Sequence, residues 1–227
     1  EKRLEQGWLS EYHYDVNEVI ESAKQAISTK QAISIGYIGN IVDLLVALDE
    51  YGLTPELGSD QTSLHNPWLG GYIPTNYSHS EALRLLKENP DKFKLEVERT
   101  LREHSSVVNR LTKKGMHFWD YGNAFLLEAS KAGGDVVNPN EPNKFRYPSY
   151  VEDIMGPICF DFGFGPFRWV CTSGDESDLK KTDEIAIEIL QLQAKNANPE
   201  IKQQILDNIR WIKEADEHQL VVGSKAR

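Results

Sequence analysis

A polar segment at residues 58–74, GSDQTSLHNPWLGGYIP, carries the side chains best suited to binding. It combines hydroxyl, amide, imidazole and carboxylate groups with a Gly-Gly pair. Such a mixture can form hydrogen bonds with several edges of a polar ligand at once. The alternative is a long turn in which the Asp, Asn, Ser and Thr side chains satisfy their own backbone. Both interpretations stay open at this point.

A second unusual segment, residues 163–174, has the sequence GFGPFRWVCTSG. It sets Arg168 among three aromatic residues, between glycines and a proline that fix a bent backbone. A guanidinium group held in this way suits a bidentate contact with a carboxylate. The alternative is an arginine stacked on Trp169 for structure, with its charge met by Asp161 or Asp175.

Two further residues could carry chemistry. Cys171 lies close to Arg168, which would favour a thiolate nucleophile, although an isolated cysteine in an apolar strand is more often a small buried hydrophobe. His65 follows Asp60 by five residues and could act as an acid or base, or simply bind a ligand or fasten the loop. The sequence contains no clustered metal ligands, no Ser/His/Asp order of a hydrolase and no P-loop motif.

Composition excludes several classes of protein. The 227 residues carry a net charge of −10, which argues against nucleic acid as the main partner. No apolar run approaches the roughly 20 residues that cross a bilayer, so no membrane association is expected. The two cysteines show neither metal spacing nor a disulfide framework, and the predicted location is the cytoplasm.

The elements that would position these side chains alternate between helix and strand. Apolar residues spaced by three and four predict a helix over 16–26, capped by Asp15. A β-branched run predicts a strand over 32–37, and a helix over 41–48 and a strand over 57–60 follow. This order predicts an α/β fold, most simply a Rossmann-like parallel sheet with crossover helices.

The polar residues follow the carboxyl ends of the predicted strands. Ligands collect at the carboxyl ends of strands in open parallel sheets, so Gly39–Asn40 and residues 60–65 should open onto one crevice. The backbone amides that start the helix after Asn40 would favour an anionic group such as phosphate. A GxGxxG motif is absent from the sequence, so a dinucleotide site would be incomplete here.

The rest of the chain repeats this alternation and then becomes helical. A strand over 116–122 leads into a helix over 123–129, and the loop NPNEPN at 138–143 is the best candidate for a domain boundary. The other predicted helices cover residues 80–86, 93–111, 179–194 and 200–215. We therefore expect a Rossmann-like region over residues 1–143 and part of a mainly helical core domain over 144–227.

Four long segments resemble the urocanase family. They read DQTSLHNPWLGGYIP, KGMHFWDYGNAFLLEASKAGGDV, FRYPSYVEDIMGP and GFGPFRWVCTSGD, and the similarity runs through essentially the whole chain. The resemblance implies hydration of urocanate to imidazolonepropionate in histidine breakdown. It also implies a homodimer and a tightly bound NAD that serves as an electrophile and carries no hydride.

The resemblance also assigns residues. It places substrate binding at Arg168, which would reach the carboxylate of urocanate. The implied NAD contacts lie in the GN, DQTSLH, GGYI and DYGN motifs, at Asn40, Ile41, Gln61, Thr62, Ser63, Leu64, His65, Tyr72, Ile73 and Tyr121.

Two departures from the family pattern limit these expectations. Neither the glycine-rich phosphate segment nor the catalytic-cysteine motif FQGLPARICW occurs in these 227 residues, and Cys171 belongs to a different motif. We expect this chain to be inactive by itself, with the catalytic residues unknown. From the strand-end loops alone, an NAD-dependent dehydrogenase or a binding or interface module without catalysis remains an alternative.

Overall fold

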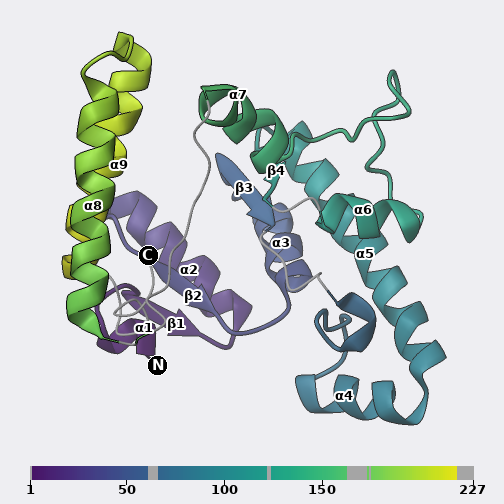
Figure 1. Cartoon of the computed structure of the whole chain (residues 1–227). Helices are drawn as coiled ribbons and strands as arrows, with labels where there is room; N and C mark the ends of the chain where they lie inside the picture. Colours follow the sequence, from purple (N-terminus) through teal and green to yellow (C-terminus); the bar gives the residue numbers. More distant parts are fainter. Residues whose placement is uncertain (1, 61–65, 122–123, 163–172, 174, 219–227) are drawn as a thin grey trace. The chain divides into compact units, whose positions relative to one another are not determined.

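The computed structural model describes residues 2–60, 66–121, 124–162, 173 and 175–218 (Figure 1). The chain divides into two compact units, Glu1–Ile154 and Met155–Arg227. Within the described ranges, no helix is both long enough and apolar enough to cross a membrane.

The first unit starts with a small β-α-β arrangement. The short helix α1 (Lys2–Glu5) precedes β1 (Glu11–His13), α2 (Val16–Thr29) and β2 (Ile35–Tyr37). The two strands pair in parallel, so α2 is the crossover between them. The predicted cap of α2 is confirmed, because Asp15 accepts a hydrogen bond from the backbone N–H of Asn17 at 2.8 Å.

A second parallel pair follows. After α3 (Ile41–Glu50), the strand β3 (Leu57–Asp60) pairs with β4 (His117–Asp120), and the crossover contains α4 (His79–Glu88) and α5 (Pro90–Lys113). The 3₁₀ helix η1 (Pro67–Leu69) and the helix α6 (Ala124–Lys131) complete this region. The α/β class with parallel strands and flanking helices is confirmed.

The pairing of the strands differs in one respect from the single sheet expected. In the part of the chain that the structure describes, β1 pairs with β2 and β3 pairs with β4, as two separate two-stranded sheets. Local sequence identifies a strand by its own side chains, whereas the partner of a strand depends on distant residues. The predicted strands were therefore found, but the sheet that joins β2 to β3 was not.

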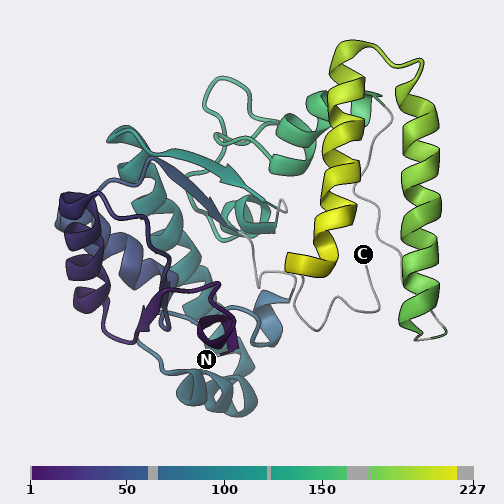
Figure 2. The ribbon, with the colours of Figure 1, turned by 90° about the vertical axis from the view of Figure 1, so that its left-hand side faces the viewer.

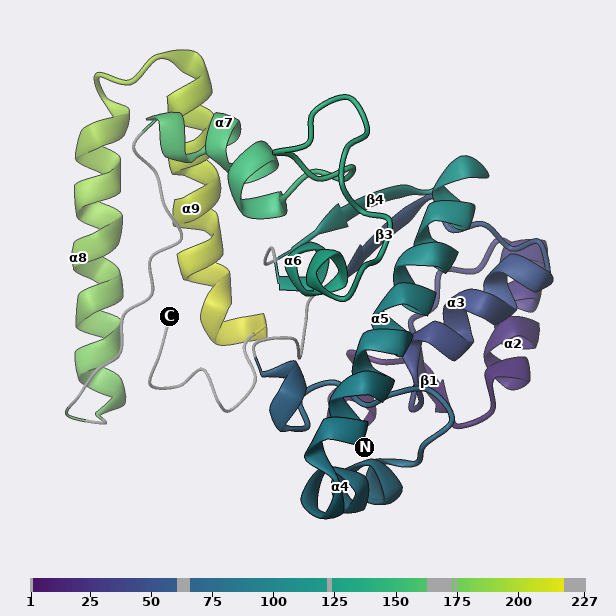
Figure 3. The ribbon, with the colours of Figure 1, turned by 90° about the vertical axis from the view of Figure 1, so that its right-hand side faces the viewer.

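The core of the first unit forms around the 24-residue helix α5, which packs against α3, α4 and α6 (Figure 3). Its buried side chains recur every three or four residues, as on one face of a helix. They include Phe93, Val97, Leu101, His104, Val108 and Leu111. Pro90 occupies the first turn of α5, where a proline costs no hydrogen bond, and the Asn89 side chain accepts from the N–H of Lys92 at 3.0 Å.

The loop at residues 138–143 is closed by a bridge between Val137 and Phe145 and lies inside the compact unit Glu1–Ile154. A π-helix, η2 (Tyr150–Met155), follows it. The division of the intact protein after residue 143 stays a prediction.

The second unit is mainly helical, as predicted. It contains α7 (Gly156–Ile158), the 3₁₀ helix η3 (Phe160–Phe162), α8 (Glu176–Ala194) and α9 (Pro199–His218). Figure 2 shows α8 and α9 side by side, joined by a short loop. Leu190, Ile205 and Ile209 are buried between them.

Candidate functional site

The two strands β3 and β4 end side by side in aspartates. Asp60 and Asp120 are register partners in this parallel pair. Pairing continues one residue further, because the N–H of Tyr121 donates to the carbonyl of Asp60 at 3.0 Å. A third segment joins the edge, since Ser149 forms a parallel bridge with Asp120 and the N–H of Asp120 donates to the carbonyl of Pro148 at 3.0 Å. The carboxyl edge is where a parallel α/β fold collects ligands.

The two carboxylates at this edge differ in their surroundings. Asp120 is fully buried, and its Oδ2 accepts a hydrogen bond from the N–H of Leu126 in α6 at 2.9 Å. Asp60 Oδ1 is also buried, and it has no hydrogen-bond partner among the residues the structure describes. Burial raises the pKa of the Asp60 carboxyl to about 7, and the neighbouring Asp120 adds to this effect. Asp60 can therefore hold or release a proton near neutral pH.

An aromatic pair stands at the same edge. The ring of Tyr121 stacks on the ring of Tyr150 with their centroids 4.9 Å apart and their planes 11° from parallel. Tyr121 keeps 39% of its surface exposed, whereas Tyr150 is partly buried. An exposed aromatic face at an edge that collects ligands can receive a flat ring.

The turn after β2 is built differently. Asn40 caps α3, because its Oδ1 accepts from the N–H of Val42 at 3.0 Å. Its Nδ2 donates to the carbonyl of Ile73 at 2.8 Å. A Cβ atom at Gly39 would collide with the ring of Tyr37, so a larger residue here would require that ring to move. Both ends of the Asn40 amide are thus engaged within the protein.

Comparison with known proteins assigns the chain to a protein family. The family model for the urocanase Rossmann-like domain matches residues 1–154, and that for the urocanase C-terminal domain matches residues 157–227. The chain belongs to the urocanase family. It is 51% identical to urocanate hydratase of Mus musculus, 50% identical to urocanate hydratase of Homo sapiens and 48% identical to the probable urocanate hydratase of Caenorhabditis elegans. Each of these alignments covers the whole of this chain but only 34% of the relative, so the chain spans about a third of their length.

Several of the residues that the urocanase resemblance had singled out lie outside the described residues. These are Gln61, Thr62, Ser63, Leu64 and His65 of the polar loop, together with Arg168; Cys171, which the resemblance does not assign, also lies outside them. Their roles stay predictions. Asp60 and Tyr121, which flank two of the undescribed segments, are described and lie at one edge.

The predicted contacts of the GN and GGYI motifs come together in this urocanase domain, although 33 positions separate Asn40 from Ile73. Ile41 begins α3 and is 41% exposed. Tyr72 is only 5% exposed, and its hydroxyl lies 3.0 Å from Nδ1 of His104 on α5. The Tyr72 side chain is therefore engaged in the core.

Burial governs the ionisation of the Tyr72–His104 pair. It raises the pKa of the Tyr72 hydroxyl and lowers the pKa of His104 to about 3, so the tyrosine stays protonated and the imidazole stays neutral. The His104 ring also lies against Phe125, with centroids 4.4 Å apart. These contacts make the pair part of the core and explain why a tyrosine from a polar loop is buried.

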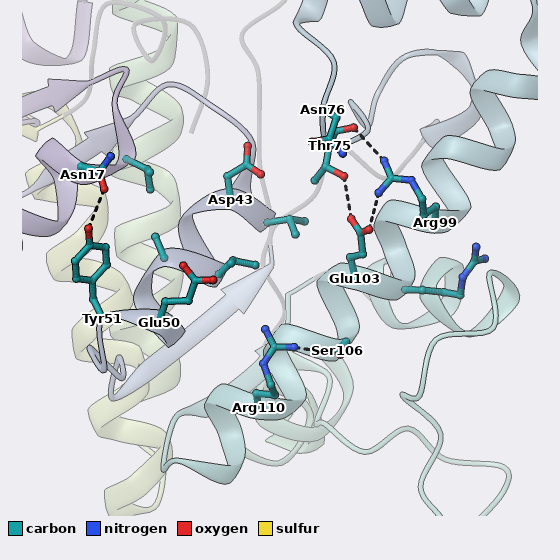
Figure 4. Close-up of a pocket in the computed structure, with 15 residues that line it drawn as sticks. Asn17, Asp43, Glu50, Tyr51, Thr75, Asn76, Arg99, Glu103, Ser106 and Arg110 are labelled. Carbon is teal, nitrogen blue, oxygen red and sulfur yellow. Dashed lines mark hydrogen bonds and ion pairs between the residues drawn. The ribbon is translucent and has the colours of Figure 1, made fainter.

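A cavity of about 710 Å³ lies elsewhere in the first unit, between α2, α3 and α5, and sequence reasoning missed it (Figure 4). Arg99 on its wall bonds to Glu103, Glu96 and the carbonyl of Thr75, so its charge is met in place. Burial and the nearby Glu103 raise the pKa of Asp43. In the sequence, this wall of the cavity is indicated only by the i, i+3 and i, i+4 spacing of charged residues around Arg99 on α5. Among the described residues, none of the predicted cofactor contacts lines this cavity.

Proposed function

We propose that the complete protein is a urocanate hydratase, which adds water to urocanate to give imidazolonepropionate in histidine degradation. The observation that carries the proposal is the identity of about 50% to proteins named urocanate hydratase along the entire chain. The edge of β3 and β4 supports it with polar and aromatic groups in one place. The same proposal includes three further properties of the complete protein. It would be a homodimer, it would be located in the cytoplasm, and this chain would divide into a cofactor region (1–143) and part of a core domain (144–227).

We propose NAD as the cofactor, and the described residues fit such a group. The exposed Tyr121 ring offers a surface for a flat heteroaromatic ring, and the buried Asp60 Oδ1 has no hydrogen-bond partner within the described ranges. Ile41, Tyr72 and Ile73 would add contacts beside the Asn40 turn. The proposed contacts that lie outside the described residues are Gln61, Thr62, Ser63, Leu64 and His65. When bound, NAD would act as an electrophile toward the imidazole ring of urocanate.

The chain's own residues would bind and orient the substrate. Arg168 would clamp the carboxylate of urocanate through two parallel hydrogen bonds. Asp60 would hold or release a proton at the edge, because its pKa lies close to neutral pH. The rigid pairing of Asp60 with Asp120 would fix the position of that proton relative to Tyr121.

The test of the function uses the full-length protein purified without added cofactor. We expect loss of urocanate absorbance with no gain of reduced-cofactor absorbance, and NAD released on denaturation. A reduced cofactor that accumulates with turnover would instead indicate a dehydrogenase, and NAD-free protein without activity would leave only a binding module. Because the chain covers a third of its relatives, we expect the 227 residues alone to be inactive even with added NAD; urocanate consumption by this chain would contradict that.

Arg168 can be tested in the same assay. Replacing it by lysine keeps the charge but removes the bidentate geometry. We expect the Michaelis constant for urocanate to rise by an order of magnitude or more, because one charged hydrogen bond of roughly 1.5–3 kcal/mol is lost. The melting temperature and the NAD content should hardly change. A destabilised variant with an unchanged Michaelis constant would show that Arg168 has a structural role only.

A further inference from the structure

Tyr150 occupies a position at the candidate site to which no role has been assigned. Asp60, Asp120 and Ser149 lie in register across three parallel segments. The residue that follows each of them therefore leaves the same carboxyl edge. Tyr121 and Tyr150 are two of these following residues, and both place aromatic rings there.

The two rings form a flat stack. Their centroids are 4.9 Å apart, and an angle of 11° between the planes leaves them almost parallel. Tyr150 is less exposed than Tyr121, of which 39% is exposed, and we therefore call Tyr150 the inner ring and Tyr121 the outer one. An outer ring supported from behind has fewer rotamers to choose from and presents a defined surface.

The backbone at Tyr150 is fixed from both sides. Ser149 is 7% exposed, and its N–H donates to Asp153 Oδ2 at 2.7 Å. In return its carbonyl accepts from the N–H of Asp153 at 2.8 Å, and its hydroxyl oxygen accepts from the N–H of Glu152 at 3.2 Å. These bonds close the first turn of the π-helix η2, an element that is frequent at functional sites. The inner ring is thus attached to a rigid support.

We propose that Tyr150 is a positioning residue, whose ring holds Tyr121 as a flat platform for the heteroaromatic ring of a bound ligand. The inference deepens the proposed function and rests on it for the identity of the ligand. Two heteroaromatic rings could stack on this platform, a ring of NAD and the imidazole of urocanate. Asp60 ends β3 at the same carboxyl edge.

The experiment compares Tyr150→Leu and Tyr150→Phe in the full-length protein. Leucine keeps apolar bulk but removes the stack, whereas phenylalanine keeps the stack and loses only the hydroxyl. We expect Tyr150→Leu to lower NAD retention, or to raise the Michaelis constant for urocanate, by about three- to tenfold, and Tyr150→Phe to stay within about twofold of the parent. Reduced NAD content would identify the cofactor ring as the occupant, and a raised Michaelis constant at full NAD content would identify the substrate ring.

Two further variants separate positioning from packing. Tyr121→Leu should weaken the same quantity, and the double variant with Tyr150→Leu should be no worse than Tyr121→Leu alone, because the inner ring acts through the outer one. Tyr51→Leu is the matched control, an exposed tyrosine at the end of α3 whose hydroxyl donates to Asn17. It should leave both quantities unchanged.

The proposal is overturned if Tyr150→Leu leaves NAD content and the Michaelis constant at parental values. It is also overturned if both Tyr150 variants lower the melting temperature equally with unchanged kinetics, or if the effects of the two leucine variants add. NAD content is measured separately from turnover. A parent protein that retains NAD but does not consume urocanate would therefore refute the proposed activity and still test the platform.

Discussion

The carboxyl ends of β2 and of β3–β4 both carry polar residues that sequence reasoning assigned to one ligand crevice, yet they are built differently. At β2, Asn40 uses its oxygen to cap α3 and its nitrogen to bind the Ile73 carbonyl. At β3–β4, Asp60 Oδ1 finds no hydrogen-bond partner within the described ranges and Tyr121 exposes its ring. A polar side chain past a strand can therefore have both its hydrogen-bonding groups engaged in the fold, as Asn40 has, or keep one without a partner among the described residues, as Asp60 does.

The largest effect expected from this difference is a pH dependence of stability that comes from Asp60. Burial raises its pKa to about 7, so the folded protein keeps a proton that the unfolded chain releases above about pH 4. The free energy of unfolding should thus fall as the pH rises from about 4 to 7, by at most about 1.4 kcal/mol per pH unit, and level off above 7. Urea titrations of the parent and of Asp60→Asn at several pH values isolate this contribution as the difference between the two curves.

A second variant makes the Asp60 test sharper. Asp120→Asn keeps an oxygen that can accept from the Leu126 N–H but removes the neighbouring charge. The upper end of the pH window should then move down, although burial, the larger cause, should keep it above the usual range for a carboxyl. Parallel pH curves for the parent and Asp60→Asn would show that Asp60 is not a buried proton carrier.

The next effect concerns Asn40. Asn40→Ala removes a helix cap and a hydrogen bond to Ile73, so we expect the free energy of unfolding to fall by about 1–3 kcal/mol. Asn40→Asp retains the capping oxygen and loses only the hydrogen bond to Ile73, so its free energy of unfolding should fall by less than that of Asn40→Ala. Molecules that remain folded should retain NAD. If the variant instead keeps the parental melting temperature but retains no NAD, Asn40 is a direct ligand contact and has no structural role.

Tyr72 gives a somewhat smaller effect. Tyr72→Phe removes the hydroxyl that pairs with the buried His104, at a cost of about 1–2 kcal/mol in unfolding free energy. NAD content should not change, because the Tyr72 side chain lies in the core. Calorimetry and NAD release on one preparation check both statements. Lost NAD at unchanged stability would place the hydroxyl in the site after all.

Ile41 should give the smallest change in stability. It is 41% exposed at the start of α3, so Ile41→Ala should alter the free energy of unfolding by no more than about 0.5 kcal/mol. If its side chain contacts the cofactor, NAD retention should nonetheless fall by about two- to tenfold, as expected for lost apolar contact. Equal NAD content in the parent and the variant would remove Ile41 from the site.

Much of the fold follows from local sequence. The Asp15 cap and the apolar face of α2 depend on residues within a few positions, and both were predicted. Helix α5 was predicted to begin at residue 93 but begins at Pro90. The strand β1 has only three residues and leaves no periodic pattern, so it was missed. The separation of β2 from β3 into different sheets depends on contacts across the chain that no local pattern contains.

The candidate site also has one feature that agrees with local sequence and others that depend on distant residues. The capping role of Asn40 agrees with its residue type, which is favoured at helix N-termini. The burial of Tyr72 could not be predicted from its polar loop, because the partner that holds it, His104, lies on α5, 32 positions away. The raised pKa of Asp60 likewise comes from burial and, to a smaller extent, from Asp120, and local sequence predicts neither.

The long crossover between β3 and β4 also has a consequence for how the chain folds. Leu57 pairs with His117, sixty positions later, so closing this pair costs more chain entropy than forming α4 or α5. The helices should therefore form early, and the two strands should dock onto them late in folding. Asp60 would then lose its water only in the last step, and folding above neutral pH would have to bury it as an anion.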